Sequence, residues 1–166
     1  LSPGVTDVLE AVTLKSDDTF SWSKTPAGIE LKSLKDPGPY KSCVNLPVAL
    51  PNDYAIEAWF TNRVDGGRDE GLTIPVGDQL RTTCWIWPRG GDWAGLGKVD
   101  GRDPQQPDIE PSCSTSFKLV PGELTFMCTE VRRTPGQVDI RFMVNGQLMA
   151  AYRGPTSRLG MSAAWY

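Results

Sequence analysis

The chain contains no histidine among its 166 residues. This absence excludes Ser-His-Asp and Cys-His nucleophilic systems, imidazole acid–base catalysis and every metal site that needs a histidine ligand. The sequence also lacks a C-x-x-C pair, and the spacing of its cysteines matches no zinc-binding pattern. No apolar run approaches the ~20 residues that span a bilayer, so we expect no membrane span.

The chain also has little excess of one charge sign. The formal net charge is -3, and the lysine and arginine residues are scattered rather than clustered. This distribution gives no footprint for a nucleic acid, so we expect no nucleic-acid partner. The hydrophobic content of 39% and the charged content of 22% are typical of a folded globular protein.

The four cysteines are Cys43, Cys84, Cys113 and Cys128. An even number is compatible with two disulfides, in any of three connectivities, and with an extracytoplasmic or secreted protein. Four buried thiols in a cytoplasmic domain fit the same residues, because free cysteine packs as a small hydrophobe. Both interpretations stay open at this stage.

Glycine (17 residues) and proline (14 residues) interrupt the chain about every ten residues, which favours short strands over long helices. In residues 54–60 the alternation places Tyr54, Ile56, Ala58 and Phe60 on one strand face, and Glu57 and Trp59 on the other. Asn145-Gly146 predicts a two-residue hairpin turn between residues 138–144 and 147–152. Further strands are expected over residues 20–23, 28–33, 72–76, 81–87, 95–99, 115–119, 124–132 and 162–165.

These elements predict an all-β fold, an antiparallel β-sandwich of the jelly-roll type. Residues 6–14 form either a short helical or irregular N-terminal segment or a first strand. We expect one domain over residues 1–166, with peripheral strands in 1–39, the sandwich in 40–154 and a closing segment in 155–166.

Three of the six tryptophans, Trp85, Trp87 and Trp93, lie within nine residues. Strand alternation divides this segment into two stripes. The first stripe, which suits a core, is Thr82, Cys84 and Ile86. The second, which combines a cation with two indoles, is Arg81, Thr83, Trp85 and Trp87. The second stripe either faces a ligand or lies beneath a loop or another sheet.

The order of residues 53–60, 71–77, the Trp-containing strand, residues 95–101 and the hairpin at 144–148 resembles the concanavalin A-like lectin/glucanase superfamily. In particular, the chain is similar to laminin-G-like and keto-disaccharide-hydrolase-like modules of bacterial proteins, over roughly residues 40–154. The resemblance implies a jelly roll. The Glu-x-Asp-x-x-Glu motif of the laminarinase-type members is absent, so the resemblance transfers no catalytic residue.

In such a sandwich, one sheet face lies beneath the loops and suits a ligand. We expect this face to carry Trp85, Trp87, Arg81, Trp59 and Glu57, with Trp93 as a wall. Their expected neighbours on other strands are Thr125, Met127, Thr129, Arg141 and Met143. Indoles stack on pyranose faces while charged groups fix hydroxyls, so the leading function is a non-catalytic carbohydrate-binding module. The alternative for these residues is a covered face or an inverted register.

Two other functions stay open. A glycoside-active enzyme of the same fold would use Glu57 as acid or base, and it needs a second carboxyl group across the bond. The candidates for that second group lie in loops: Asp65, Asp69, Glu70, Asp92 and Asp100. A structural or protein-interaction domain of a larger bacterial assembly would instead bury its indoles.

The acidic loops that contain Asp65, Asp69 and Glu70, and Asp100 and Asp103, have enough carboxylates for Ca²⁺. Each loop also contains an arginine, and neither matches the EF-hand pattern. Solvated turns are therefore the favoured interpretation, and we expect no cofactor.

Overall fold

The computed structural model describes a defined part of the chain, which falls into two compact units, Leu1–Ala49 and Leu50–Tyr166. The described residues are 6–8, 11–12, 14, 20–33, 50–61, 70–76, 81–87, 92–102 and 113–160. At the N-terminus, the Ala11 N–H donates to the Val8 carbonyl oxygen at 3.1 Å. The described positions between 6 and 14 form no α-helix.

In the first unit, strands β1 (Phe20–Thr25) and β2 (Gly28–Ser33) form an antiparallel hairpin. Thr25 fixes the turn, because its Oγ1 accepts from the Ala27 N–H and donates to the Gly28 carbonyl oxygen, both at 3.2 Å. Gly28 has φ of 129°, a conformation that a residue with a side chain rarely adopts. The two strands predicted around this turn are confirmed.

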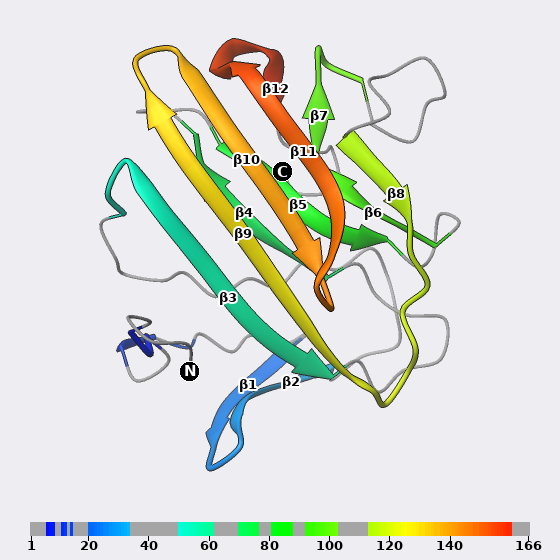
Figure 1. The fold of residues 1–166 in the computed structure, drawn as a ribbon. Helices are drawn as coiled ribbons and strands as arrows, with labels where there is room; N and C mark the ends of the chain where they lie inside the picture. Colours follow the sequence, from blue (N-terminus) through cyan, green and yellow to red (C-terminus); the bar gives the residue numbers. More distant parts are fainter. Residues whose placement is uncertain are drawn as a thin grey trace. The chain divides into compact units, whose positions relative to one another are not determined.

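The second unit is built from antiparallel strands in two four-stranded sheets, ordered β11-β10-β9-β3 and β4-β5-β6-β8 (Figure 1). The first sheet, in front in Figure 1, contains β3 (Asp53–Thr61), β9 (Leu124–Thr134), β10 (Gln137–Val144) and β11 (Gln147–Pro155). The second sheet contains β4 (Glu70–Pro75), β5 (Arg81–Trp87), β6 (Trp93–Leu96) and β8 (Ser114–Ser116). Strands β7 (Lys98–Val99) and β12 (Leu159–Gly160) pair separately.

Alternation sets the two faces of the front sheet. Along β10, the side chains that are fully or almost fully buried are Val138, Ile140, Phe142 and Val144. The β3 residues on the same side of the sheet are Tyr54, Ile56, Ala58 and Phe60, and the register aligns the first three through β9 with Ile140, Phe142 and Val144. The four β3 residues pack against the core, as their spacing predicts.

The second sheet contributes the opposing core face. Thr82, Cys84 and Ile86 of β5 are fully buried, and β6 adds Ala94 and Leu96. Two hydrogen bonds join the sheets directly. The Tyr54 hydroxyl donates to the Pro75 carbonyl oxygen, and the Thr115 hydroxyl donates to the Met149 carbonyl oxygen, each at 2.9 Å. The predicted all-β antiparallel sandwich is therefore confirmed.

The β10–β11 hairpin turns at Asn145 and Gly146, whose φ values are 49° and 79°. Both values are positive, as the two central residues of a type I′ turn require. The Asn145 side chain also accepts the Phe126 N–H at 2.8 Å, which fixes the turn to β9. A bulge between Phe142 and Met143 shifts the register before the turn. The hairpin predicted from the Asn-Gly pair is thus confirmed.

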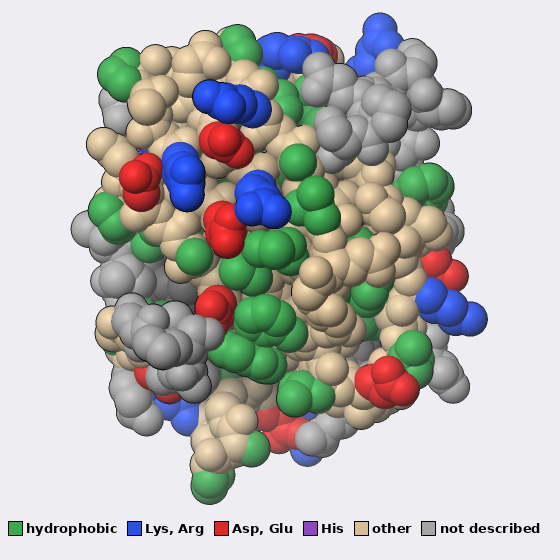
Figure 2. All heavy atoms as spheres, viewed as in Figure 1, with side chains coloured by type: hydrophobic (Ala, Val, Ile, Leu, Met, Phe, Trp, Pro, Cys, Tyr) green, Lys and Arg blue, Asp and Glu red, His purple; other side chains and the backbone are tan. Residues whose placement is uncertain are grey.

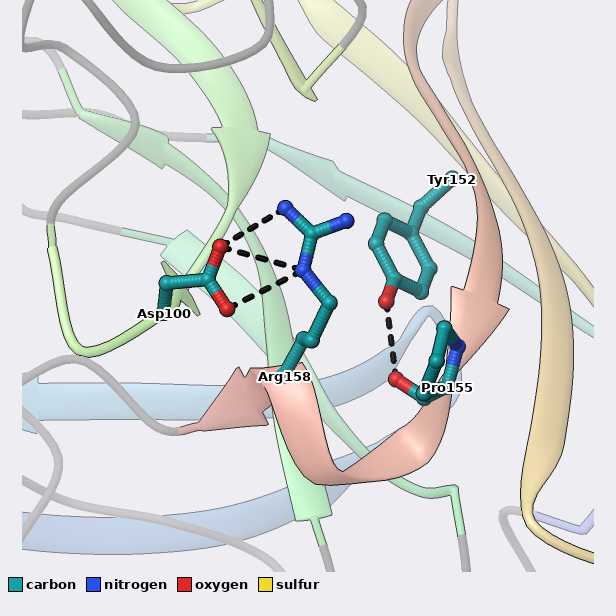
Figure 3. Close-up of polar contacts among 4 residues, drawn as sticks. All are labelled: Asp100, Tyr152, Pro155 and Arg158. Carbon is teal, nitrogen blue, oxygen red and sulfur yellow. Dashed lines mark hydrogen bonds and ion pairs between the residues drawn. The ribbon is translucent and has the colours of Figure 1, made fainter.

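An ion pair closes the β7–β12 ribbon. Asp100 follows β7 with φ of 52°, and Arg158 ends the short 3₁₀ helix η4 (Thr156–Arg158). The Arg158 guanidinium donates to both carboxylate oxygens of Asp100 at 2.6–3.0 Å, and the Asp100 N–H donates to the Arg158 carbonyl oxygen. Figure 3 shows this pair beside Tyr152, whose hydroxyl donates to the Pro155 carbonyl oxygen at 2.8 Å.

Gly95 in β6 allows the backbone at the start of β8 to approach closely. A Cβ at this position would lie 2.5 Å from the Cys113 carbonyl oxygen and 2.7 Å from the Ser114 Cβ. We expect Gly95→Ala to lower the free energy of unfolding by about 1–3 kcal/mol, because backbone must move to admit the methyl group. Urea unfolding measures this.

Gly160→Ala is the matched control, since the nearest atom to its added Cβ is the Lys98 Cβ at 3.6 Å. Equal stability of the two variants would contradict the close packing of β6 against β8.

Candidate functional site

The Trp-rich strand β5 is buried on both faces over much of its length. Trp85 is 2% exposed, and its indole N–H donates to the Leu96 carbonyl oxygen at 3.0 Å. Thr83, two residues earlier on the same face, is fully buried, whereas Arg81 is exposed. Trp85 therefore does not offer an indole face to solvent, which was the first of the two interpretations of this stripe.

Both direct cross-strand partners of Trp85 are glycines, Gly71 of β4 and Gly95 of β6. Trp93 is half-buried and is the first residue of β6 rather than part of a loop, and it pairs with Trp87. The Trp87 side chain lies outside the described part of the structure.

The predicted single ligand face is wrong, because its members belong to two sheets. Glu57 and Trp59 lie on β3, which pairs with β9, whereas Arg81 and Trp85 lie on β5, which pairs with β4 and β6. Alternation assigned each residue correctly within its own strand. It cannot reveal which strands are neighbours when the pairing partners lie more than sixty residues apart in sequence.

The solvent face of the front sheet is the candidate site. We call its apolar end the aromatic patch (Figure 2). Its members are Trp59 of β3, Leu124 and Phe126 of β9, Met143 of β10 and Leu148 of β11. Trp59, Leu124 and Leu148 are 47%, 67% and 44% exposed, which is unusual for large hydrophobic side chains gathered on one sheet.

Trp59 and Phe126 form the centre of the aromatic patch. They are direct cross-strand partners, and their ring centroids lie 4.7 Å apart with an interplanar angle of 35°. Aromatic cross-strand pairs stabilise a sheet, so Phe126 supports the indole from one side. The result is a large, partly exposed indole held in one orientation on a regular strand.

Charged side chains cover the other end of the same face, seen at the upper left of Figure 2. Glu130 of β9 and Arg141 of β10 are cross-strand partners whose nearest charged atoms lie 3.6 Å apart. The next row across the sheet, with alternating sign, is Asp53, Arg132, Asp139 and Arg153. We call these six residues the charged end.

Cys128 lies at the boundary between the two ends. It pairs with Glu57 on β3 and with Met143 on β10, and it is 8% exposed. Burial raises the pKa of the Cys128 thiol, and the carboxylates of Glu130 and Glu57 raise this pKa further. Both carboxylates therefore act on one spot next to the aromatic patch.

Of the neighbours expected from the sequence, Arg141 and Met143 lie on this solvent face. Thr125, Met127 and Thr129 do not, because they occupy the alternate positions of β9 and are buried on the core side. Sequence reasoning missed Phe126, Glu130 and Leu148. Phe126 and Glu130 alternate along β9 with the buried Thr125, Met127 and Thr129, so strand alternation would have placed them on the solvent face.

Among the carboxylates that the structure describes, none of the loop candidates lies with Glu57 on the front sheet. Asp92 and Asp100 flank strands outside the front sheet, whereas Glu57 points away from the core. Asp65 and Asp69 lie outside the described residues, as does the side chain of Glu70. The carboxylate nearest to Glu57 in the register is Glu130, and it is paired with Arg141.

The described part of the acidic loops forms no metal site. Asp100 is bound by Arg158, whose hydrogen bonds hold the pKa of this carboxyl below its usual range. A carboxylate neutralised by a guanidinium is a poor calcium ligand. Within the described ranges, no three His, Cys, Asp or Glu side chains gather as a metal site would need. No helix there is long and apolar enough to cross a membrane.

The cysteines of the described residues are Cys84, Cys113 and Cys128, and all three are buried and not disulfide-bonded. The predicted disulfides are therefore not formed among them. Cys43 lies outside the described residues. Cys84 and Cys113 pack as small core side chains, as the alternative interpretation of the sequence had it, whereas Cys128 is buried on the outward side of β9.

Comparison of the chain with models of protein families, with curated proteins and with solved structures finds no match. The resemblance to the concanavalin A-like superfamily stays a prediction.

The buried thiol of Cys84 makes stability depend on alkaline pH. Burial raises its pKa from about 9 to about 12, so the folded protein disfavours the thiolate. Above about pH 9 the thiol ionises in the unfolded chain but not in the folded protein, so ionisation favours unfolding. The contribution of Cys84 to the free energy of unfolding is therefore complete below about pH 9 and is lost as the pH rises from 9 to 12. We expect the free energy of unfolding to fall across that range, by at most about 4 kcal/mol from this group. Urea unfolding with a reducing agent present measures it.

Cys84→Ala should flatten this pH dependence. Ile86→Val, a change to a buried side chain on the same face of β5 that does not ionise, should lower stability equally at every pH. An unchanged alkaline slope in Cys84→Ala would contradict the assignment. Tyr54→Phe should remove a further part of the slope, because burial also raises the pKa of this phenol well above its usual range.

Proposed function

We propose that this protein is a non-catalytic carbohydrate-binding module that holds its ligand on the aromatic patch of the front sheet. The observation that carries this proposal is the partly exposed Trp59 indole, whose ring centroid lies 4.7 Å from that of Phe126 on the neighbouring strand. A fixed indole face covers the apolar face of a pyranose and loses little side-chain entropy on binding.

The surroundings of Trp59 supply the polar contacts that a sugar needs. Glu57 lies two residues away on the same face of β3, so the two Cβ atoms are separated by about 7 Å along the strand. A carboxylate at this distance can accept hydrogen bonds from the hydroxyls of a ring seated on the indole. Asn145 stands at the edge of the patch next to Phe126, and its side-chain amide adds a second polar group there.

The pairing of the charges on this face favours binding over hydrolysis. Glycoside cleavage needs two carboxyl groups that flank the scissile bond, one of them available as an acid. Of the two carboxylates at diagonal positions here, Glu57 and Glu130, the second is paired with Arg141 at 3.6 Å. An open face with one indole platform fits an extended glycan that is held without being cleaved.

A structural or protein-interaction role remains the alternative, since exposed apolar patches also mark protein interfaces. The burial of Trp85 agrees with that alternative for the second sheet. The exposed Trp59, with a carboxylate beside it, favours the glycan for the front sheet.

Trp59→Ala tests the proposal. We expect it to weaken binding of a soluble oligosaccharide at least tenfold, because covering an indole face contributes about 1.5–3 kcal/mol. A glycan array with neutral, amino and acidic oligosaccharides identifies the tightest ligand, and calorimetry then compares the variants. Loss of the cross-strand contact with Phe126 should lower the free energy of unfolding by about 1 kcal/mol, so urea unfolding of the variant checks that it remains folded.

Arg153→Ala, at the charged end of the same face, is the matched control and should bind as the wild type does. Absence of binding across the array, or equal affinity of the wild type and Trp59→Ala, would overturn the proposal.

A further inference from the structure

The charged residue nearest to Trp59 among the described residues of the front sheet is a carboxylate. Glu57 is separated from Trp59 by one residue on β3, and Glu130 is diagonal to Glu57 on β9. The nearest described basic side chain in the register is Arg141, which is two rows along the strands and two strands across from Trp59. A ligand seated on the indole therefore meets carboxylates before it meets a guanidinium.

The indole itself adds attraction of the same kind. The face of an aromatic ring carries negative electrostatic potential, and tryptophan attracts cations more strongly than the other aromatic residues. The raised pKa of the Cys128 thiol reports the same sign, because both Glu130 and Glu57 disfavour a negative charge at this sulfur. Two independent features, the π face of Trp59 and the carboxylate of Glu57, thus favour a positive charge at one place.

We propose that the glycan bound on the aromatic patch carries protonated amino groups, as an oligomer of an unacetylated amino hexose does. This inference rests on the proposed function, and it names the chemical class of its ligand. The apolar face of the sugar ring lies on Trp59, and an ammonium substituent of the same or the next ring lies toward Glu57.

General magnitudes set the expected size of this preference. A cation over an exposed tryptophan gains a factor of about two to five in affinity. A carboxylate about 7 Å away in a water-like medium contributes a factor of about three. Together they predict that an amino oligosaccharide binds roughly tenfold tighter than a neutral one of equal length. A uronic acid oligomer should bind more weakly than either, because its carboxylates meet the same field.

The region of negative potential on this face is small. Glu130 is paired with Arg141, and the row beyond it alternates in sign, so its charges largely balance. The negative field is therefore local to the boundary beside the aromatic patch. A single amino sugar residue matches this local field, whereas a long basic peptide would also face Arg132 and Arg153.

Calorimetry at about pH 6, where an amine is protonated, provides the test. The ligands are a glucosamine oligomer, its N-acetylated form, a neutral glucose oligomer and a glucuronate oligomer, all of one length, and a lysine peptide. We expect the glucosamine oligomer to bind about tenfold tighter than the two neutral oligomers. Salt at about 1 M should reduce this preference, because it shortens the screening length to about 3 Å.

Glu57→Gln keeps the shape of the side chain and removes its charge. We expect the ratio of the affinities for the amino and the glucose oligomer to fall about threefold in this variant, because the charge attracts only the ammonium group. Asp139→Asn removes an equal charge at the charged end and should leave the preference unchanged.

The outcomes separate this inference from the proposed function. Equal binding of the amino and neutral oligomers, with loss of both in Trp59→Ala, would overturn the amino-sugar class and leave a carbohydrate-binding module. Binding of none of the oligomers would overturn both proposals. Tighter binding of the lysine peptide than of any oligomer would replace the glycan with a basic protein partner.

Discussion

The packing of two sheets through one apolar face each is the constraint from which the other features follow. Once Phe142 and Ile140 of the front sheet meet Cys84 and Ile86 of the second, strand alternation decides where every other side chain of these strands points. The cross-sheet hydrogen bond from Tyr54 to the Pro75 carbonyl oxygen then satisfies polar groups at the edge of the core. The solvent face of the front sheet is thus defined by what the core leaves out.

The outward faces of the two sheets differ in character. In the second sheet, the outward-facing Thr83 and Trp85 are buried, and the indole satisfies its N–H on the Leu96 carbonyl oxygen. In the front sheet, Trp59 and Leu148 remain almost half exposed. A buried polar indole stabilises a fold when its donor has a partner, whereas an exposed one increases the apolar surface in contact with water. Only the exposed indole of the front sheet calls for an explanation in terms of binding.

The sequence predicts the strands, their inward faces and the Asn145-Gly146 turn, because these depend on local patterns of period two and on turn chemistry. It also places Glu57 and Trp59 correctly on the outward face of β3. It does not predict that β3 pairs with β9, since no local signal encodes a long-range pairing. Glu57 and Trp59 were therefore grouped with Trp85, and Phe126 was missed. The state of the cysteines was equally undetermined, because burial and disulfide formation leave the same spacing.

The contrast between Trp85 and Trp59 gives the chain two optical reporters in opposite surroundings. An indole enclosed in apolar packing emits at shorter wavelength and is shielded from a dissolved quencher, while one at the surface relaxes with water and is quenched readily. Trp85, at 2% exposure, therefore reports on the integrity of the second sheet, and Trp59, at 47%, reports on events at the surface of the first. Because the chain has six tryptophans, the difference between the emission of the wild type and that of a variant lacking one of these two indoles isolates the signal of that indole.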